Sequence, residues 1–88
     1  MDLMTARVEG IVLGVHRRNG GSLERLDLNL RLLDPALGLD SLDLAEIVAT
    51  IEKISHCSPF DSPVPPRTWA ELIGQLPKED AAVGPTKV

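Results

Sequence analysis

Apolar residues recur at helical spacing near the start of the chain and would form one stripe along a helix. The residues of this stripe are Met4, Val8, Ile11, Val12 and Val15. Their spacing predicts an amphipathic helix over residues 3–17, which Gly20 and Gly21 then end. Arg17 and Arg18 fall at the end of this helix, where the helix dipole favours cations.

The stretch over residues 22–39 carries mixed signals. Between Leu26 and Leu32, leucines alternate with polar residues, and this period taken alone indicates a β-strand. No second run of this kind occurs in the sequence, so the strand would have no partner. We therefore expect a long loop that some of its leucines pin to a helical core, with short helical turns possible over residues 23–26.

A second apolar stripe follows over residues 41–55 and predicts a helix with one buried face. The residues of this stripe are Leu44, Ile47, Val48, Ile51 and Ile54. Asp43, Glu46 and Glu52 fall outside the stripe and are expected to face outward. Ser41 stands at the start of the helix, where serine is a favoured N-cap.

Prolines at four positions exclude a long helix over residues 56–67. These are Pro59, Pro63, Pro65 and Pro66. At most one short turn is expected there, over residues 61–64. Thr68 with Glu71 three residues later is a capping-box pattern and predicts a last helix that runs to about Leu76. The apolar face of that helix would consist of Trp69, Leu72, Ile73 and Leu76.

These elements predict an all-α fold, a small helical bundle with three main helices, a long first loop and a short or irregular third element. A chain of 88 residues has room for one core. We expect residues 1–77 to form that domain and the polar residues 78–88 to form a flexible C-terminal tail. Phe60 and Trp69 are the only aromatic residues, so the core must be mainly aliphatic.

The charge and the cysteine content exclude several classes of function. A net charge of −4 argues against a nucleic-acid partner and favours a partner with a basic surface. Cys57 is the single cysteine, so no disulfide can form within the chain, and a reducing cytoplasmic location is expected. No apolar run approaches the roughly 20 residues of a membrane span, and no signal peptide is recognised.

No constellation of residues in the sequence indicates catalysis or a metal site. His16 lies near the end of the first predicted helix, where an exposed or dipole-compensating role is expected. His56 and Cys57 are adjacent in a proline-rich connector, and nothing supplies the third group that an activated nucleophile needs. Two histidines and one cysteine without ligand spacing predict no metal site.

The sequence LGLDSLDLAEI over residues 37–47 resembles the attachment site of acyl carrier proteins. That family carries a Gly-x-Asp-Ser-Leu run at the start of its second helix, followed by an acidic amphipathic helix. The resemblance covers about residues 3–76 and implies an acyl-carrier-type helical bundle. It implies that Ser41 carries a covalent 4'-phosphopantetheine arm, with Asp40 and Leu42 as the flanking residues of the site.

The function implied by this resemblance is that of a non-catalytic carrier. The arm would hold acyl or polyketide intermediates as thioesters and pass them between enzymes of a fatty-acid, polyketide or related specialised pathway. A phosphodiester on Ser41 would lie at a helix N-terminus, which is a favourable place for an anion. Gly38 keeps the approach uncrowded. Taken alone, a serine at this position is more often a simple N-cap.

The predicted second helix is also a candidate docking surface. Residues 32–52 contain five acidic residues and no basic residue. By resemblance, this acidic helix would bind basic patches on partner enzymes through Asp43, Glu46, Glu52, Ala45 and Ala49, with Leu42 as a further apolar contact. The partners implied are a phosphopantetheinyl transferase, an acyl-loading enzyme or ligase, and ketosynthase-type or acyltransferase enzymes, and we expect a monomer. The plainer interpretation is a solvated helix face.

The chain departs from the family pattern in ways that favour a specialised carrier. The prolines shorten the third element, Lys53 stands where the family often has an acid, and Ile54 replaces a common phenylalanine. Two alternatives stay open. One is an aminoacyl or peptidyl carrier, although such carriers usually have Gly-Gly before the residue that precedes the serine. The other is a helical adaptor of the same fold that is never modified.

Overall fold

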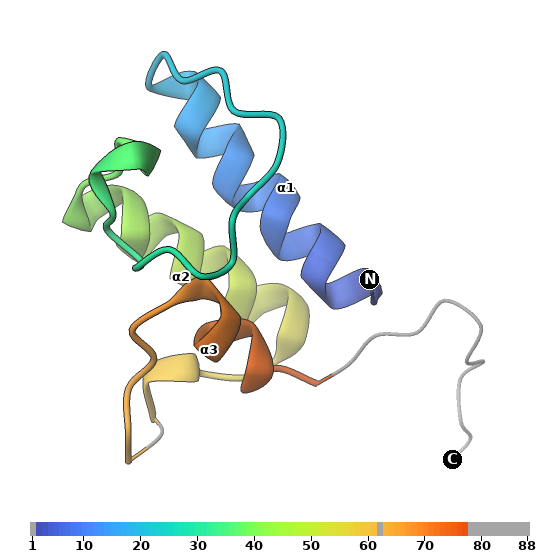
Figure 1. Ribbon diagram of the computed structural model, residues 1–88. Helices are drawn as coiled ribbons and strands as arrows, with labels where there is room; N and C mark the ends of the chain where they lie inside the picture. Colours follow the sequence, from blue (N-terminus) through green and yellow to red (C-terminus); the bar gives the residue numbers. More distant parts are fainter. Residues whose placement is uncertain (1, 62, 78–88) are drawn as a thin grey trace.

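A computed structural model of the chain describes residues 2–61 and 63–77. Three α-helices span Leu3–Arg18 (α1), Ser41–Ser55 (α2) and Trp69–Gly74 (α3) (Figure 1). Two single 3₁₀ turns, η1 over Pro35–Leu37 and η2 over Pro59–Asp61, lie in the connections. The described part of the chain contains no β-strand. The all-α prediction is therefore confirmed, whereas the tail expected over residues 78–88 lies outside the described residues.

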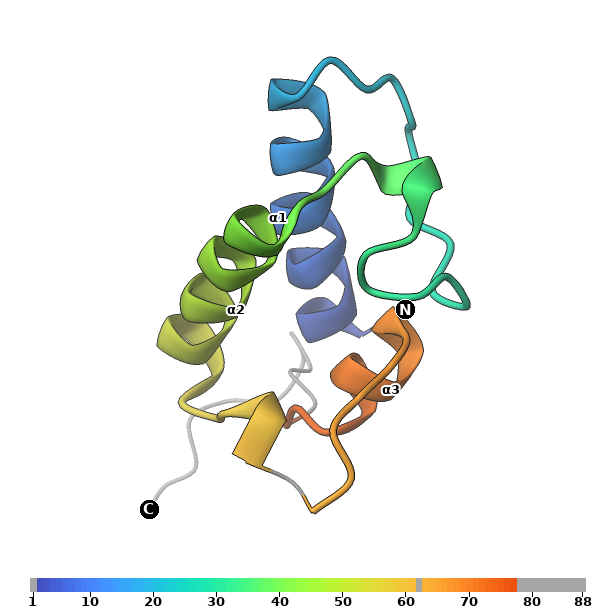
Figure 2. The same cartoon turned by 90° about the vertical axis from the view of Figure 1, so that its left-hand side faces the viewer.

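Helices α1 and α2 lie side by side and run in opposite directions, and α3 lies near the N-terminal end of α1 (Figure 2). The apolar stripes predicted for the three helices meet between them. The most deeply buried side chains include Val8, Val12, Leu37, Ile47, Ile51, Trp69 and Leu72. Ile11, Leu44, Val48 and Ile54 of the predicted stripes are half-buried. The core therefore contains only part of each predicted stripe, and the fully buried apolar residues of α2 are Ile47 and Ile51.

The long connection between α1 and α2 is held to the core by its leucines, as predicted. Leu26, Leu32, Leu37 and Leu39 are buried. Glu9 of α1 also ties the loop down, because its carboxylate accepts from the backbone N–H of Leu26 at 2.9 Å and from Arg25 at 3.0 Å. The helical turn expected over residues 23–26 is absent. It forms instead at η1, where the Asp34 carboxylate accepts from the N–H of Ala36 and proline supplies the first position.

The alternating segment over residues 28–32 finds a partner that the sequence pattern did not predict. The N–H of Leu32 donates to the carbonyl of Arg67, and the N–H groups of Trp69 and Ala70 donate to the carbonyls of Leu30 and Leu28. Arg31 and Thr68 form one isolated antiparallel bridge. The prediction of an unpaired loop was wrong here, because the partner is a short stretch that follows prolines and has no strand-like pattern of its own.

Side chains cap the starts of α1 and α3. The Asp2 carboxylate accepts from the N–H of Thr5 at 3.0 Å and so caps α1. Thr68 caps α3 as predicted, accepting from the N–H of Glu71 at 3.1 Å. The Glu71 carboxylate accepts a hydrogen bond from the N–H of Arg67 at 2.8 Å, whereas a capping box would use the N–H of Thr68.

None of the helices in the described part of the chain has the length and apolar character needed to cross a membrane.

Candidate functional site

Ser41 is the first residue of α2, and its side chain is exposed. The N-cap of this helix is Asp40, whose carboxylate accepts from the N–H of Asp43 at 2.8 Å. Asp43 completes a capping box by accepting from the N–H of Asp40 at 3.2 Å. The prediction that Ser41 caps the helix was therefore wrong. Asp40 performs this role because it is the last residue with extended backbone before the helix.

The consequence of this arrangement is that the Ser41 hydroxyl is not used to cap α2. Within the described residues, no hydrogen bond of this hydroxyl to another group is found. An unassisted serine hydroxyl is a weak nucleophile, since activation requires a base within hydrogen-bond reach. The site therefore offers an accessible alcohol, and no side chain of the described residues is hydrogen-bonded to it as a base.

The approach to Ser41 is fixed by the residues before it. Leu37 is fully buried and Leu39 is 9% exposed, so the chain is anchored on both sides of Gly38. Gly38 has a left-handed backbone (φ 64°, ψ 28°), and no atom lies within 4 Å of the position where a Cβ would stand. The conformation favours glycine, and the space around it is open. Leu42, which follows Ser41, is 80% exposed.

Arg18 at the end of α1 pairs with two of the acidic residues predicted to bind partners. Its guanidinium lies 3.3 Å from Oδ1 of Asp43 and 2.9 Å from Oε1 of Glu46. Asn19 also donates to Oδ2 of Asp43 at 2.8 Å. The N–H of Asp40, then Asn19 and Arg18, hold the pKa of Asp43 below its usual value. The hydrogen bond from Arg18 and its charge lower the pKa of Glu46 in the same way.

These contacts separate Asp43 from the other residues predicted to bind partners. The Asp43 side chain is 15% exposed and is committed to the capping box and to α1, so its expected free outward projection is wrong. The Glu46 side chain is 52% exposed despite its pairing. Ala45 and Ala49 are exposed and Glu52 is half-buried. Leu42, Ala45, Glu46 and Ala49 recur at intervals of three and four residues and therefore share one exposed face of α2.

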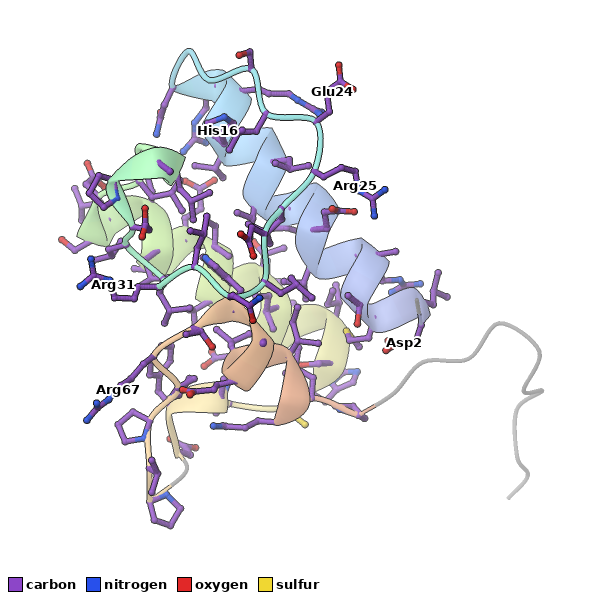
Figure 3. The ribbon with its side chains drawn as sticks, viewed as in Figure 1. Asp2, His16, Glu24, Arg25, Arg31 and Arg67 are labelled. Atoms are coloured by element: carbon purple, nitrogen blue, oxygen red, sulfur yellow. The ribbon has the colours of Figure 1, made fainter. Side chains whose placement is uncertain are left out.

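His16 does not have the exposed position that the sequence favoured. It is 5% exposed, and its side chain lies between the end of α1 and the connection to α2 (Figure 3). Its Nδ1 lies 2.8 Å from the carbonyl of Leu37 and its Nε2 lies 3.1 Å from the N–H of Leu23. Sequence periodicity could not identify these contacts, because one of them joins residues 21 positions apart.

Three of the surface pockets around the described part of the molecule lie beside α1, α3 or the approach to Ser41. One of about 250 Å³ is lined mainly by apolar residues at the start of α1 and on α3. A second, of about 600 Å³, lies beside the proline-rich connector and α3. The third, of about 200 Å³, is lined by His16, Asn19, residues 20–21 and residues 35–38, and thus borders the approach to Ser41. No group of three or more metal-ligating side chains gathers in the described residues.

A scan against protein-family models, a search of the curated proteins and a search of the solved structures found no match to this chain. Inferences about function therefore depend on the residues around Ser41 and on their geometry.

Proposed function

We propose that this chain is an acyl carrier protein whose Ser41 receives a 4'-phosphopantetheine arm. The observation that carries this proposal is the division of roles at the start of α2. Asp40 caps the helix, and Ser41 is exposed with its hydroxyl not used for capping. The resemblance of residues 37–47 to a carrier attachment site assigns a modification to this same hydroxyl.

The attachment reaction would use this alcohol as the nucleophile toward coenzyme A. The Ser41 Oγ forms a bond to the phosphorus that bears the pantetheine, and the bond from this phosphorus to the bridging pyrophosphate oxygen breaks. Adenosine 3',5'-bisphosphate leaves, and the serine proton passes to a base of the transferase. The arm then supplies a thiol that holds the acyl group as a thioester.

The residues around Ser41 fit such a group. The phosphodiester would lie at the N-terminus of α2, where the first N–H groups of a helix have no intrahelical acceptor. The open space at Gly38 and the exposed Leu42 leave room for an enzyme to reach the hydroxyl. The buried neighbours Leu37 and Leu39 hold the attachment point in place while the arm moves. A mobile arm on a fixed point raises the effective concentration of its cargo at successive enzymes.

The exposed face of α2 is the proposed docking surface for the transferase, the acyl-loading enzyme and the acceptor enzymes. It combines apolar contacts from Leu42, Ala45 and Ala49 with the carboxylate of Glu46, and Glu52 extends it. Since Arg18 already pairs with Glu46, a basic partner would compete with an internal cation there. The electrostatic part of docking is therefore expected to be weaker than the acidic sequence alone predicts.

Intact mass spectrometry tests the proposal directly. The full chain is incubated with coenzyme A, Mg²⁺ and a phosphopantetheinyl transferase of broad specificity, and a gain of one phosphopantetheine group is expected. Ser41→Ala should remain unmodified, whereas the matched change Ser58→Ala, at another exposed serine, should be modified like the parent. An unmodified parent chain would contradict the proposal and favour an adaptor that is never modified. An arm on another serine would contradict the assignment of Ser41.

A further inference from the structure

The buried imidazole of His16 joins three segments that are distant in the sequence. It extends from α1 and bonds to the backbone at both ends of the long connection, at Leu23 and at Leu37. Gly21 packs so closely on the ring that any Cβ at that position would overlap it. The ring is therefore held in one orientation by its two hydrogen bonds and by the backbone at Gly21.

The two hydrogen bonds determine which nitrogen of the ring carries a proton. The backbone N–H of Leu23 can only donate, so Nε2 of His16 accepts and has no hydrogen. The carbonyl of Leu37 can only accept, so Nδ1 carries the hydrogen and donates. Both nitrogens of this neutral tautomer are fully used. His16 therefore has no free nitrogen for catalysis or for a metal ion, and its contribution is to hold backbone.

The bond to Leu37 acts on the segment that leads to Ser41. Leu37 ends η1, and its N–H donates to the carbonyl of Asp34 at 2.9 Å. The next residue, Gly38, has the left-handed conformation that turns the chain toward Asp40. The side-chain amide of Asn19 donates to the carbonyl of Gly38 at 3.2 Å and also to the carboxylate of Asp43 in the capping box. An unbroken set of contacts thus runs from His16 and Asn19 to the start of α2.

We infer that His16 is a positioning residue for the modification of Ser41, acting through its hydrogen bond to Leu37. This inference rests on the proposed carrier function. We take the transferase to bind the backbone around Gly38 and Asp40 in one conformation. When a binding-competent conformation is only partly populated, the apparent affinity falls by that fraction. Loss of the Leu37 bond is therefore expected to raise the KM for the carrier and to leave kcat nearly unchanged.

Two amide substitutions separate the two bonds of the ring. In His16→Asn, the side-chain NH₂ stands near the place of Nδ1 and can still donate to Leu37. In His16→Gln, the amide extends to the place of Nε2, so it can accept from Leu23 and loses Leu37. Both variants are neutral, and both lose one bond. Met4→Ala is the control for general destabilisation, because Met4 is equally buried at the opposite end of α1.

Steady-state loading by the transferase is measured for the four proteins at a temperature where circular dichroism shows all of them folded. We expect kcat/KM of His16→Gln to fall roughly three- to tenfold, the equivalent of one lost hydrogen bond. The kcat/KM of His16→Asn should stay within about twofold of the parent, because this variant retains the bond to Leu37. Met4→Ala should stay within the same range, because Met4 lies far from the attachment site. Amide hydrogen exchange at Leu37 and Gly38 should be faster in His16→Gln than in His16→Asn.

The outcomes distinguish this inference from the proposed function beneath it. A parent chain that is modified while His16→Gln and His16→Asn load equally well would overturn the positioning role and leave the carrier function intact. A loss of loading that follows thermal stability across Met4→Ala and both His16 variants would also overturn it. A parent chain that receives no arm would overturn the carrier function, and the role of His16 with it.

Discussion

Ile51→Ala should be among the most damaging single changes in the core. Ile51 is fully buried in the middle of α2, in the core shared with α1 and α3. The change removes three carbons, which at about 0.8 kcal/mol each costs roughly 2.4 kcal/mol in transfer free energy. The cavity left behind raises the expected loss to about 3–5 kcal/mol. A domain of this size has a free energy of unfolding on the order of 5–10 kcal/mol, so a large part of its stability would be lost.

Urea denaturation followed by the fluorescence of Trp69 measures this loss, because Trp69 is the single tryptophan and is fully buried. Thermal denaturation should show a melting temperature lower by roughly 12–30 °C. The matched control is Ile54→Ala, the same substitution one turn later at a half-buried position. That variant should lose about 1–2 kcal/mol. If Ile54→Ala were as damaging as Ile51→Ala, our placement of the core on Ile47 and Ile51 would be wrong.

Three further predictions concern the helix caps and the ion pairs. Asp40→Ala should cost about 0.5–2 kcal/mol of stability in thermal denaturation, and Ser41→Ala should cost less than about 0.5 kcal/mol, because Asp40 is the cap; equal losses would contradict this assignment. The pKa is below its usual value for four carboxyl groups, those of Asp2, Glu9, Asp43 and Glu46. The stability that their charged forms add is complete above about pH 5 and is lost as the pH falls further. A melting temperature that stays constant down to about pH 3 would refute this. If the proposed docking surface is used, Arg18→Ala should strengthen binding of a basic partner by a few-fold in low salt, since it frees the exposed carboxylate of Glu46, whereas Arg17→Ala should not. Binding that is unchanged in Arg18→Ala would exclude competition by this arginine.

The helices could be predicted from the sequence because each of them carries an apolar stripe at the helical period. Their starts could be predicted to within a residue because capping residues are few and act locally. The error at α2 shows the limit of this reasoning. Asp40 and Ser41 are adjacent and both are good caps, and only the backbone conformation shows that Asp40 is the last extended residue.

The contacts around the candidate site could not be predicted in this way. The hydrogen bonds there join residues that are 21 to 28 positions apart, namely His16 with Leu37, Asn19 with Asp43, and Arg18 with Glu46. Such pairs depend on how α1 and α2 pack, and no local period encodes them. The pairing of residues 28–32 with residues 67–70 is of the same kind. Residues 28–32 show an alternation of leucines and polar residues in the sequence. Residues 67–70 follow prolines and show no strand-like alternation.

That pairing sets an order for folding. The hydrogen bonds of Trp69 and Ala70 to Leu30 and Leu28 close a loop that contains the whole of α2, and closing so long a loop early is entropically costly. With six residues, α3 is too short to be stable alone. It should therefore form last, on a surface that α1, α2 and the leucine segment have already made. In the native protein, the amide protons of Leu32, Trp69 and Ala70 should then exchange together, in one opening event that releases α3 while α1 and α2 stay paired.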